Sequence, residues 1–119
     1  MEYLLLIHSE TQGNAEAIPE AARNQMLAAY KAYTEAVHQA GIVRGSNRLQ
    51  PAASGTAVRV RNGKTEVHNG PYIETREELG GYYLIDVPDL DAALSWAARC
   101  PGAAHGTVEV RPIWPMGEY

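Results

Sequence analysis

The strongest constraint on the fold comes from two short segments that are apolar on both faces of a strand. The alternating faces of residues 2–8 (EYLLLIH) are Tyr3, Leu5, Ile7 and Leu4, Leu6, His8. Residues 82–87 (YYLIDV) alternate in the same way and carry one charge, at Asp86. Because a strand of this kind excludes water from both sides, the sheet that contains it needs a covering layer on each face.

Helices and a hairpin are predicted between and after these strands. Residues 21–41 repeat apolar side chains at steps of three and four, which predicts a helix that ends at Gly41. Residues 88–100 predict a second helix, with Asp89 as its N-cap and a core face of Leu90, Ala93, Leu94 and Ala97. Residues 56–69 alternate on either side of Asn62-Gly63, the dipeptide that most favours a tight hairpin.

Residues 42–55 are expected to form a loop that contains at most a short strand, and residues 107–113 a final strand. With one extra hairpin strand set aside, the order is βαββαβ, which is the ferredoxin-like α+β pattern: an antiparallel sheet with two helices on one face. The 119 residues suit one domain, 1–119. Two helices cover one face, so we expect a homodimer packed sheet against sheet, with a small-molecule cavity between or beside the sheets.

Composition removes several classes of partner. The net charge is −4 and the Lys and Arg residues are scattered, which argues against nucleic-acid binding. The longest wholly apolar run, Leu4–Ile7, is far too short to cross a membrane. The single cysteine, Cys100, excludes an internal disulfide and fits a cytoplasmic location. No metal-ligand spacing and no phosphate-binding loop is present, so we expect neither a metal nor a cofactor.

A polar stretch, residues 68–81 (HNGPYIETREELGG), separates the hairpin from the strand at 82–87. One interpretation is a connection whose Gly and Pro residues set the backbone, with an Asn cap and solvated charges. The other is a pocket wall that places an aromatic ring and opposite charges against a ligand. In that second interpretation the ligand-binding residues are Asn69, Tyr72, Glu74 and Arg76.

Two further residues are candidates for catalysis. His8 ends an apolar strand, where it faces either a pocket or solvent, and Glu10 is placed to tune its charge. Tyr30 lies on the apolar stripe of the first helix, either as a core tyrosine or as a hydroxyl donor in a cavity. Cys100 follows a helix C-terminus, where partial negative charge disfavours the thiolate, so it is a poor nucleophile.

The stretch NGPYIETREELGGYYLIDVPDLDAALSWAARCP, followed by VEVRPI, resembles the YCII-related superfamily. Within it the sequence is similar to the branch named for an Asp-Gly-Pro-Phe (DGPF) motif. The resemblance covers nearly the whole chain and implies a ferredoxin-like domain that dimerises as a dimeric α/β barrel. It also implies one of two functions. The first is a ligand-binding or accessory role beside a sigma factor, and the alternative is an enzyme acting by acid/base chemistry on a small aromatic compound.

This sequence departs from the pattern of the enzymatic relatives. The resemblance assigns their acid/base pair to a histidine on the first helix and an aspartate before the proline that follows the second. The matching positions here are Tyr30 and Cys100. The motif Asp is replaced by Asn69 and the motif Phe by Tyr72. An amide does not titrate, so Asn69 is not a general base. The alternative function therefore places the proton shuttle at His8, with Tyr30 or the loop from Tyr72 to Arg76 orienting the substrate.

Overall fold

The computed structural model describes residues 1–10, 19–72 and 76–118. In chain order the elements are β1 (Glu2–Glu10), α1 (Glu20–Gln39), β2 (Val43–Arg48), the short 3-10 helix η2 (Ala52–Ser54), β3 (Thr56–Arg61), β4 (Lys64–Asn69), β5 (Glu77–Asp86), α2 (Leu90–Arg99), α3 (Gly102–His105) and β6 (Thr107–Pro112). The predicted helices and strands are all present. The single turn of α3 was not predicted, and β5 begins five residues earlier than expected.

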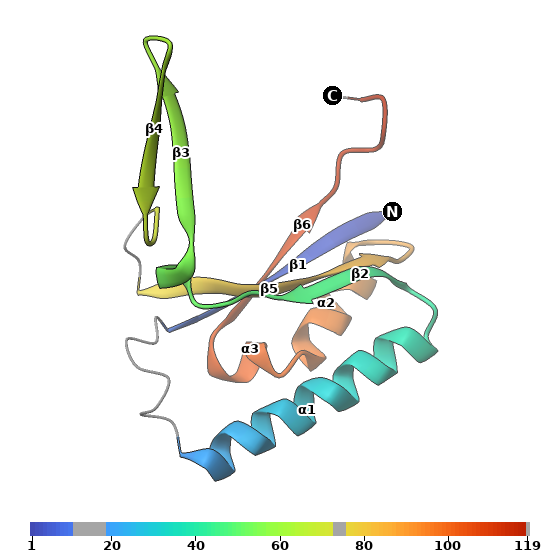
Figure 1. The fold of residues 1–119 in the computed structure, drawn as a ribbon. Coiled ribbons are helices and arrows are strands. Elements are labelled where there is room, and N and C mark those ends of the chain that lie inside the picture. The colour runs from blue at the N-terminus through green and yellow to red at the C-terminus, as the bar shows by residue number, and fades with distance from the viewer. Residues whose placement is uncertain (11–18, 73–75, 119) are drawn as a thin grey trace.

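Four strands form one antiparallel sheet in the order β2-β5-β1-β6, and α1, α2 and α3 lie on one side of it (Figure 1). This is the ferredoxin-like α+β arrangement that the sequence predicts. The faces of β1 are assigned correctly. Tyr3, Leu5 and Ile7 are buried beneath the helices, whereas Leu4, Leu6 and His8 on the opposite face keep partial exposure.

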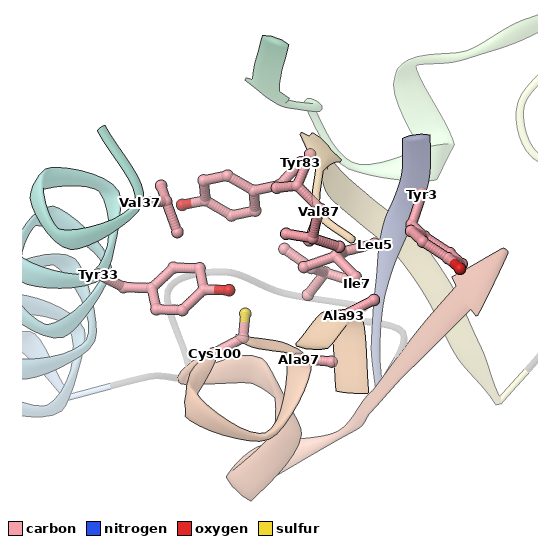
Figure 2. Close-up of a cluster of buried hydrophobic side chains, with 11 residues drawn as sticks. Tyr3, Leu5, Ile7, Tyr33, Val37, Tyr83, Val87, Ala93, Ala97 and Cys100 are labelled. Atoms are coloured by element: carbon pink, nitrogen blue, oxygen red, sulfur yellow. The ribbon is translucent and has the colours of Figure 1, made fainter. Parts of the chain in front are cut away.

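The core fills the space between this sheet and the helices (Figure 2). Tyr33 and Tyr83 meet edge to face with ring centroids 5.2 Å apart, and the Tyr33 hydroxyl donates to the Trp96 carbonyl at 2.7 Å. The predicted core face of α2 is half right. Ala93 and Ala97 are buried in the core. Leu90 and Leu94 are each 47% exposed, so they do not belong to the core.

The hairpin departs from the expected topology. We expected one of its strands to join the sheet, but β3 and β4 pair only with each other, in a separate two-stranded sheet. The edge position next to β5 is taken by β2, from the segment expected to be mostly loop. Asn62 and Gly63 both have positive φ, as a tight turn requires. Figure 1 shows the hairpin standing away from the sheet on the side opposite the helices.

Two glycines in the polar stretch have a clear packing role. The pairing of β1 with β5 shifts between Ile7 and His8, because Gly80 has no partner there and forms a β-bulge. Beside it, a Cβ on Gly81 would lie 2.8 Å from the Asn47 carbonyl oxygen of β2. The Gly-Gly pair therefore lets β5 bend and lets β2 approach it closely.

Candidate functional site

The side of the sheet away from α1, α2 and α3 is an open face, and in Figure 1 the β3–β4 hairpin and the segment after β6 rise at its two ends. Its middle is apolar, with partly exposed side chains at Leu4, Leu6 and Leu84. Tyr82 lies on this face too, and its hydroxyl accepts a hydrogen bond from the Asn47 amide at 2.8 Å. Ligand-binding surfaces usually combine apolar side chains with a few oriented polar groups, as this face does.

Three ionisable side chains form a network along the β6 edge of the open face, from His8 to Arg111. The His8 Nε2 atom lies 3.3 Å from Glu109 Oε1, and the Arg111 Nε atom donates to the other carboxylate oxygen at 2.7 Å. The hydrogen bond and charge of Arg111, with a smaller contribution from His8, hold the pKa of Glu109 below its usual range. Glu109 therefore stays ionised at neutral pH and fixes the orientation of the imidazole.

A depression of about 480 Å³ lies where β1 ends and β5 and β6 begin, and two residues of α3 form part of its lining. It is lined by Glu10, Arg76, Glu77, Ala104, His105, Gly106 and Thr107. Thr107 pairs with His8 across the strands, and its hydroxyl donates to Glu77 at 3.2 Å. The sheet thus brings two of the predicted residues, His8 and Arg76, to the same end. We call this region the polar end of the open face.

Tyr30 lies on the other side of the sheet. Its hydroxyl lies near enough to the Cys100 thiol for each group to shift the pKa of the other, so the two positions that the family resemblance singles out are neighbours. Burial raises the pKa of Tyr30, and the neighbouring thiol raises it further. Burial also raises the pKa of Cys100. Both groups are therefore protonated at neutral pH, and Tyr30 is separated from His8 by the sheet.

The remaining predicted residues lie at the base of the hairpin. Asn69 is the exposed last residue of β4, paired with Thr56. Tyr72 is 61% exposed, and the guanidinium carbon of Arg59 lies 5.0 Å from the centre of its ring. The Tyr72 ring and the Arg59 guanidinium border a second depression, of about 390 Å³. Glu74 lies outside the described residues.

Sequence reasoning did not find the partners of His8. It named Glu10 as the carboxylate that tunes the imidazole, whereas the contact in the structure comes from Glu109 on β6. Glu109 and Arg111 alternate with apolar residues on that strand, which marks them as one polar face. Only the register between β1 and β6 shows that this face is the one that carries His8.

The described part of the chain offers neither a membrane-spanning helix nor a cluster of metal-ligating side chains. None of the helices in the described ranges is long and apolar enough to cross a membrane. Within residues 1–10, 19–72 and 76–118, no three His, Cys, Asp or Glu side chains gather closely enough to hold a metal ion.

The sequence and the fold of this chain were compared with those of known proteins. An uncharacterised protein of Rhizobium meliloti is 40% identical over 77 residues, which cover 63% of this chain and 62%, or less than two thirds, of that protein. A solved structure of 5-chloro-2-hydroxyhydroquinone dehydrochlorinase from Burkholderia phenoliruptrix, in complex with 2,5-dihydroxybenzoquinone, is similar in fold. The TM-score is 0.56 at 14% identity, over 98% of this chain and 96% of the other. The YCII-related domain family matches residues 1–117, and the chain therefore belongs to that family.

Proposed function

We propose that this protein is a small-ligand-binding homodimer whose site is the polar end of the open face. The observation that carries the proposal is the His8–Glu109–Arg111 network, set on an otherwise leucine-rich sheet face beside the depression that contains Arg76. Three linked ionisable groups at the edge of an apolar surface are of little use to packing alone. They suit a ligand that has a flat apolar body and hydrogen-bonding substituents.

The chemistry of the lining defines the ligand class further. Arg76 and His105 supply hydrogen-bond donors, whereas Glu10 and Glu77 supply acceptors. A small ring with hydroxyl, keto or carboxylate groups matches this mixture. The ligand of the structural neighbour, 2,5-dihydroxybenzoquinone, belongs to the same class and is therefore the first probe to use.

Binding is tested by titrating the protein with 2,5-dihydroxybenzoquinone and with simple aromatic acids while amide NMR signals are followed. We expect shifts at His8, Arg76 and Thr107, and a rise in Tm that grows with ligand concentration. His8→Gln should weaken binding, whereas His38→Gln, at an exposed site in the last turn of α1, should not. Absence of shifts at the polar end with every compound would count against the proposal.

The homodimer has its own support. The open face presents Leu4, Leu6 and Leu84 with no described layer over them, although the same strands are fully covered on the helix side. A second copy turned face to face would remove these side chains from water. Sedimentation velocity at micromolar concentrations should give a particle of twice the 13.0 kDa chain mass. Leu6→Asp should yield monomers, and Leu27→Asp, at an exposed leucine of α1, should leave the dimer intact.

One observation favours a catalytic alternative. The His8 imidazole and the Glu109 carboxylate form the pairing that orients a general base, and His8 is only partly exposed. In this version His8 moves a proton of a small aromatic substrate and Arg76 orients it, because Tyr30 lies across the sheet. Incubation with 5-chloro-2-hydroxyhydroquinone tests the idea. Chloride release that His8→Gln abolishes supports catalysis, and no release together with retained binding favours the ligand-binding role.

The family resemblance suggests an accessory role beside a sigma factor. In that case the bound ligand would report on metabolism to a protein partner. Co-purification of the tagged protein with and without ligand, with the Leu6→Asp variant as control, would detect such a partner.

A further inference from the structure

The β3–β4 hairpin, which we call the arm, has two chemically different faces. Its strand register places Val58 opposite Val67, and Val60 opposite Thr65, on one face. The other face pairs Arg59 with Glu66 and Arg61 with Lys64. The three valines are each about 60% exposed (Val58 62%, Val60 60%, Val67 62%). The arm is thus an amphipathic ribbon whose apolar side is uncovered in the single chain.

An uncovered ribbon of this kind is poorly stable. A two-stranded hairpin alone in water is marginal and becomes stable when its apolar side packs against something. Within the described residues, the arm joins the rest of the molecule at its base. There the Gly70 amide donates to the Gly55 carbonyl, and the Ala52 amide to the Glu78 carboxylate. The described residues leave the valine face exposed, so packing against a second chain would stabilise it.

The C-terminal segment presents a second uncovered apolar group. Trp114, which follows β6, is 68% exposed. The arm is attached where β5 begins, opposite Glu10 of β1, whereas this segment leaves the sheet where β6 ends, opposite Tyr3. The two features therefore lie at opposite ends of the strands. Figure 1 shows both rising on the side of the sheet away from the helices.

Face-to-face packing of two copies about a two-fold axis allows two arrangements. One brings arm beside arm, and the other brings the arm of each copy to the C-terminal segment of its partner. Residues 56–69 carry three cations and one carboxylate, a charge of +2. Because the whole sequence has a net charge of −4, the residues outside the arm carry a charge of −6. Like charge disfavours two adjacent arms, whereas Glu118 makes the C-terminal segment acidic, so the second arrangement is favoured.

We infer that the arm is a subunit clasp, whose valine face packs against the Trp114 segment of a second copy of this chain. The inference rests on the proposed homodimer and specifies its geometry. Since each arm stands at the polar end of its own sheet, the same arrangement brings the partner subunit's Trp114 over the depression that contains Arg76. The partner would then supply an aromatic wall to a site that is incomplete in one chain.

The first test compares substitutions on the two faces of the arm. One variant combines Val58→Thr, Val60→Thr and Val67→Thr, which keep β-branched side chains but remove apolar surface. The control combines Arg61→Lys and Lys64→Arg on the other face, which keep the charge of the arm. In a two-fold symmetric dimer each substitution removes its apolar contact at two places. The dimer Kd measured by sedimentation should therefore rise at least about 100-fold in the valine variant. It should change less than about threefold in the control.

The outcomes of this test are distinct. An unchanged Kd in the valine variant overturns the clasp while leaving sheet-against-sheet dimerisation, which Leu6→Asp probes separately. A wild-type chain that is monomeric at all concentrations overturns the homodimer and the clasp together. Ligand binding at the polar end of that monomer would still be measurable, so the proposed function is judged independently.

A second test does not depend on the stability of the valine variant. Trp96→Phe leaves Trp114 as the sole tryptophan of an otherwise intact arm and sheet. Its fluorescence emission should move to shorter wavelength as the protein is concentrated through the dimer Kd. Trp114→Phe, which leaves the Trp96 that stacks on Arg99, should show no such shift. Emission of Trp114 that stays solvent-like in the dimer overturns the clasp.

Discussion

The hydroxyl of Tyr30 on α1 and the thiol of Cys100 after α2 are neighbours beneath the sheet, and each shifts the pKa of the other. A neutral phenol and a neutral thiol thus occupy the two positions that the resemblance assigns to an acid/base pair in enzymatic relatives. Neither group offers a proton acceptor of useful strength near neutral pH, because burial raises the pKa of both. Proton chemistry, where it occurs in this chain, is better supported at His8 and Glu109.

The first prediction concerns the reactivity of that thiol. Cys100 is 2% exposed, so iodoacetamide at pH 8 should label it at least about 100-fold more slowly than free cysteine. Gly102→Ala should speed the reaction, because the added Cβ would lie 2.7 Å from both the Tyr30 hydroxyl and an Ile7 methyl. Ala103→Ser, at the exposed neighbour, is the control. Mass spectrometry measures the rates, and fast labelling of the wild type would contradict the buried placement.

The second prediction concerns alkaline pH. Burial raises the pKa of Tyr30, Tyr33, Tyr83 and Cys100 above ordinary values of 10.0 for the phenols and 9.0 for the thiol. The unfolded chain therefore releases these protons at a lower pH than the folded chain. Stability is fully present below about pH 9 and is lost as pH rises, by up to about 1.4 kcal/mol per pH unit for each group.

Urea denaturation between pH 7 and pH 11 measures this loss. Tyr33→Phe should lower stability at pH 7 by about 1 kcal/mol, since the hydrogen bond to the Trp96 carbonyl disappears, and it should also make the alkaline slope shallower. Tyr72→Phe, at an exposed ring, should change neither quantity. If unfolding free energy falls with alkaline pH equally steeply in Tyr33→Phe and the wild type, the raised pKa of Tyr33 is contradicted.

The third prediction uses the two adjacent glycines of β5. A methyl group at Gly81 would lie 2.8 Å from a backbone oxygen of β2, whereas at Gly80 the nearest atom is 3.8 Å away. Gly81→Ala should therefore destabilise the fold by about 1–3 kcal/mol, and Gly80→Ala by much less. Thermal unfolding of the matched pair checks this. Equal losses at the two positions would show that β2 does not approach β5 as closely as described.

The fourth prediction concerns the charged network of the open face. Arg111 donates the hydrogen bond that contributes most to the lowered pKa of Glu109, so Arg111→Gln should raise that pKa toward its usual range. NMR titration of the Glu109 carboxyl measures it, with Lys31→Gln on α1 as control. A lowered folded-state pKa stabilises the fold above the unfolded value of about 4.3, and this contribution is lost as pH falls through the folded value. The fall in unfolding free energy at acid pH should therefore differ between the Arg111→Gln variant and the wild type.

Local patterns in the sequence predicted much of this fold. Alternation separated the two faces of β1, with Tyr3 on one and Leu4 on the other, and Asn62-Gly63 marked the turn of the arm. These signals work because each depends on neighbours in the chain. The apolar residues on both faces of β1 and β5 also led to the expectation of a second covering layer, which stays a prediction.

Long-range pairings were harder to predict. The segment Val43–Arg48 contains Gly45 and Asn47, which disfavour strands, yet it takes the sheet edge because the bend at Gly80 and Gly81 admits it. The partner of His8 was misassigned for a similar reason. Glu10 is near His8 in sequence, whereas Glu109 reaches it from the neighbouring strand β6, and strand register cannot be read from either strand alone.

The arm enters and leaves the molecule between two neighbouring strands of the sheet, and the four-stranded frame is complete without it. Such an insertion point lets evolution lengthen, shorten or recharge the arm without disturbing the hydrogen bonding of β2, β5, β1 and β6. If the arm clasps a second subunit, the choice of partner copy and the shape of the shared cavity can diverge among relatives while the frame stays constant. For protein engineering, the same point is a natural place to graft a different hairpin.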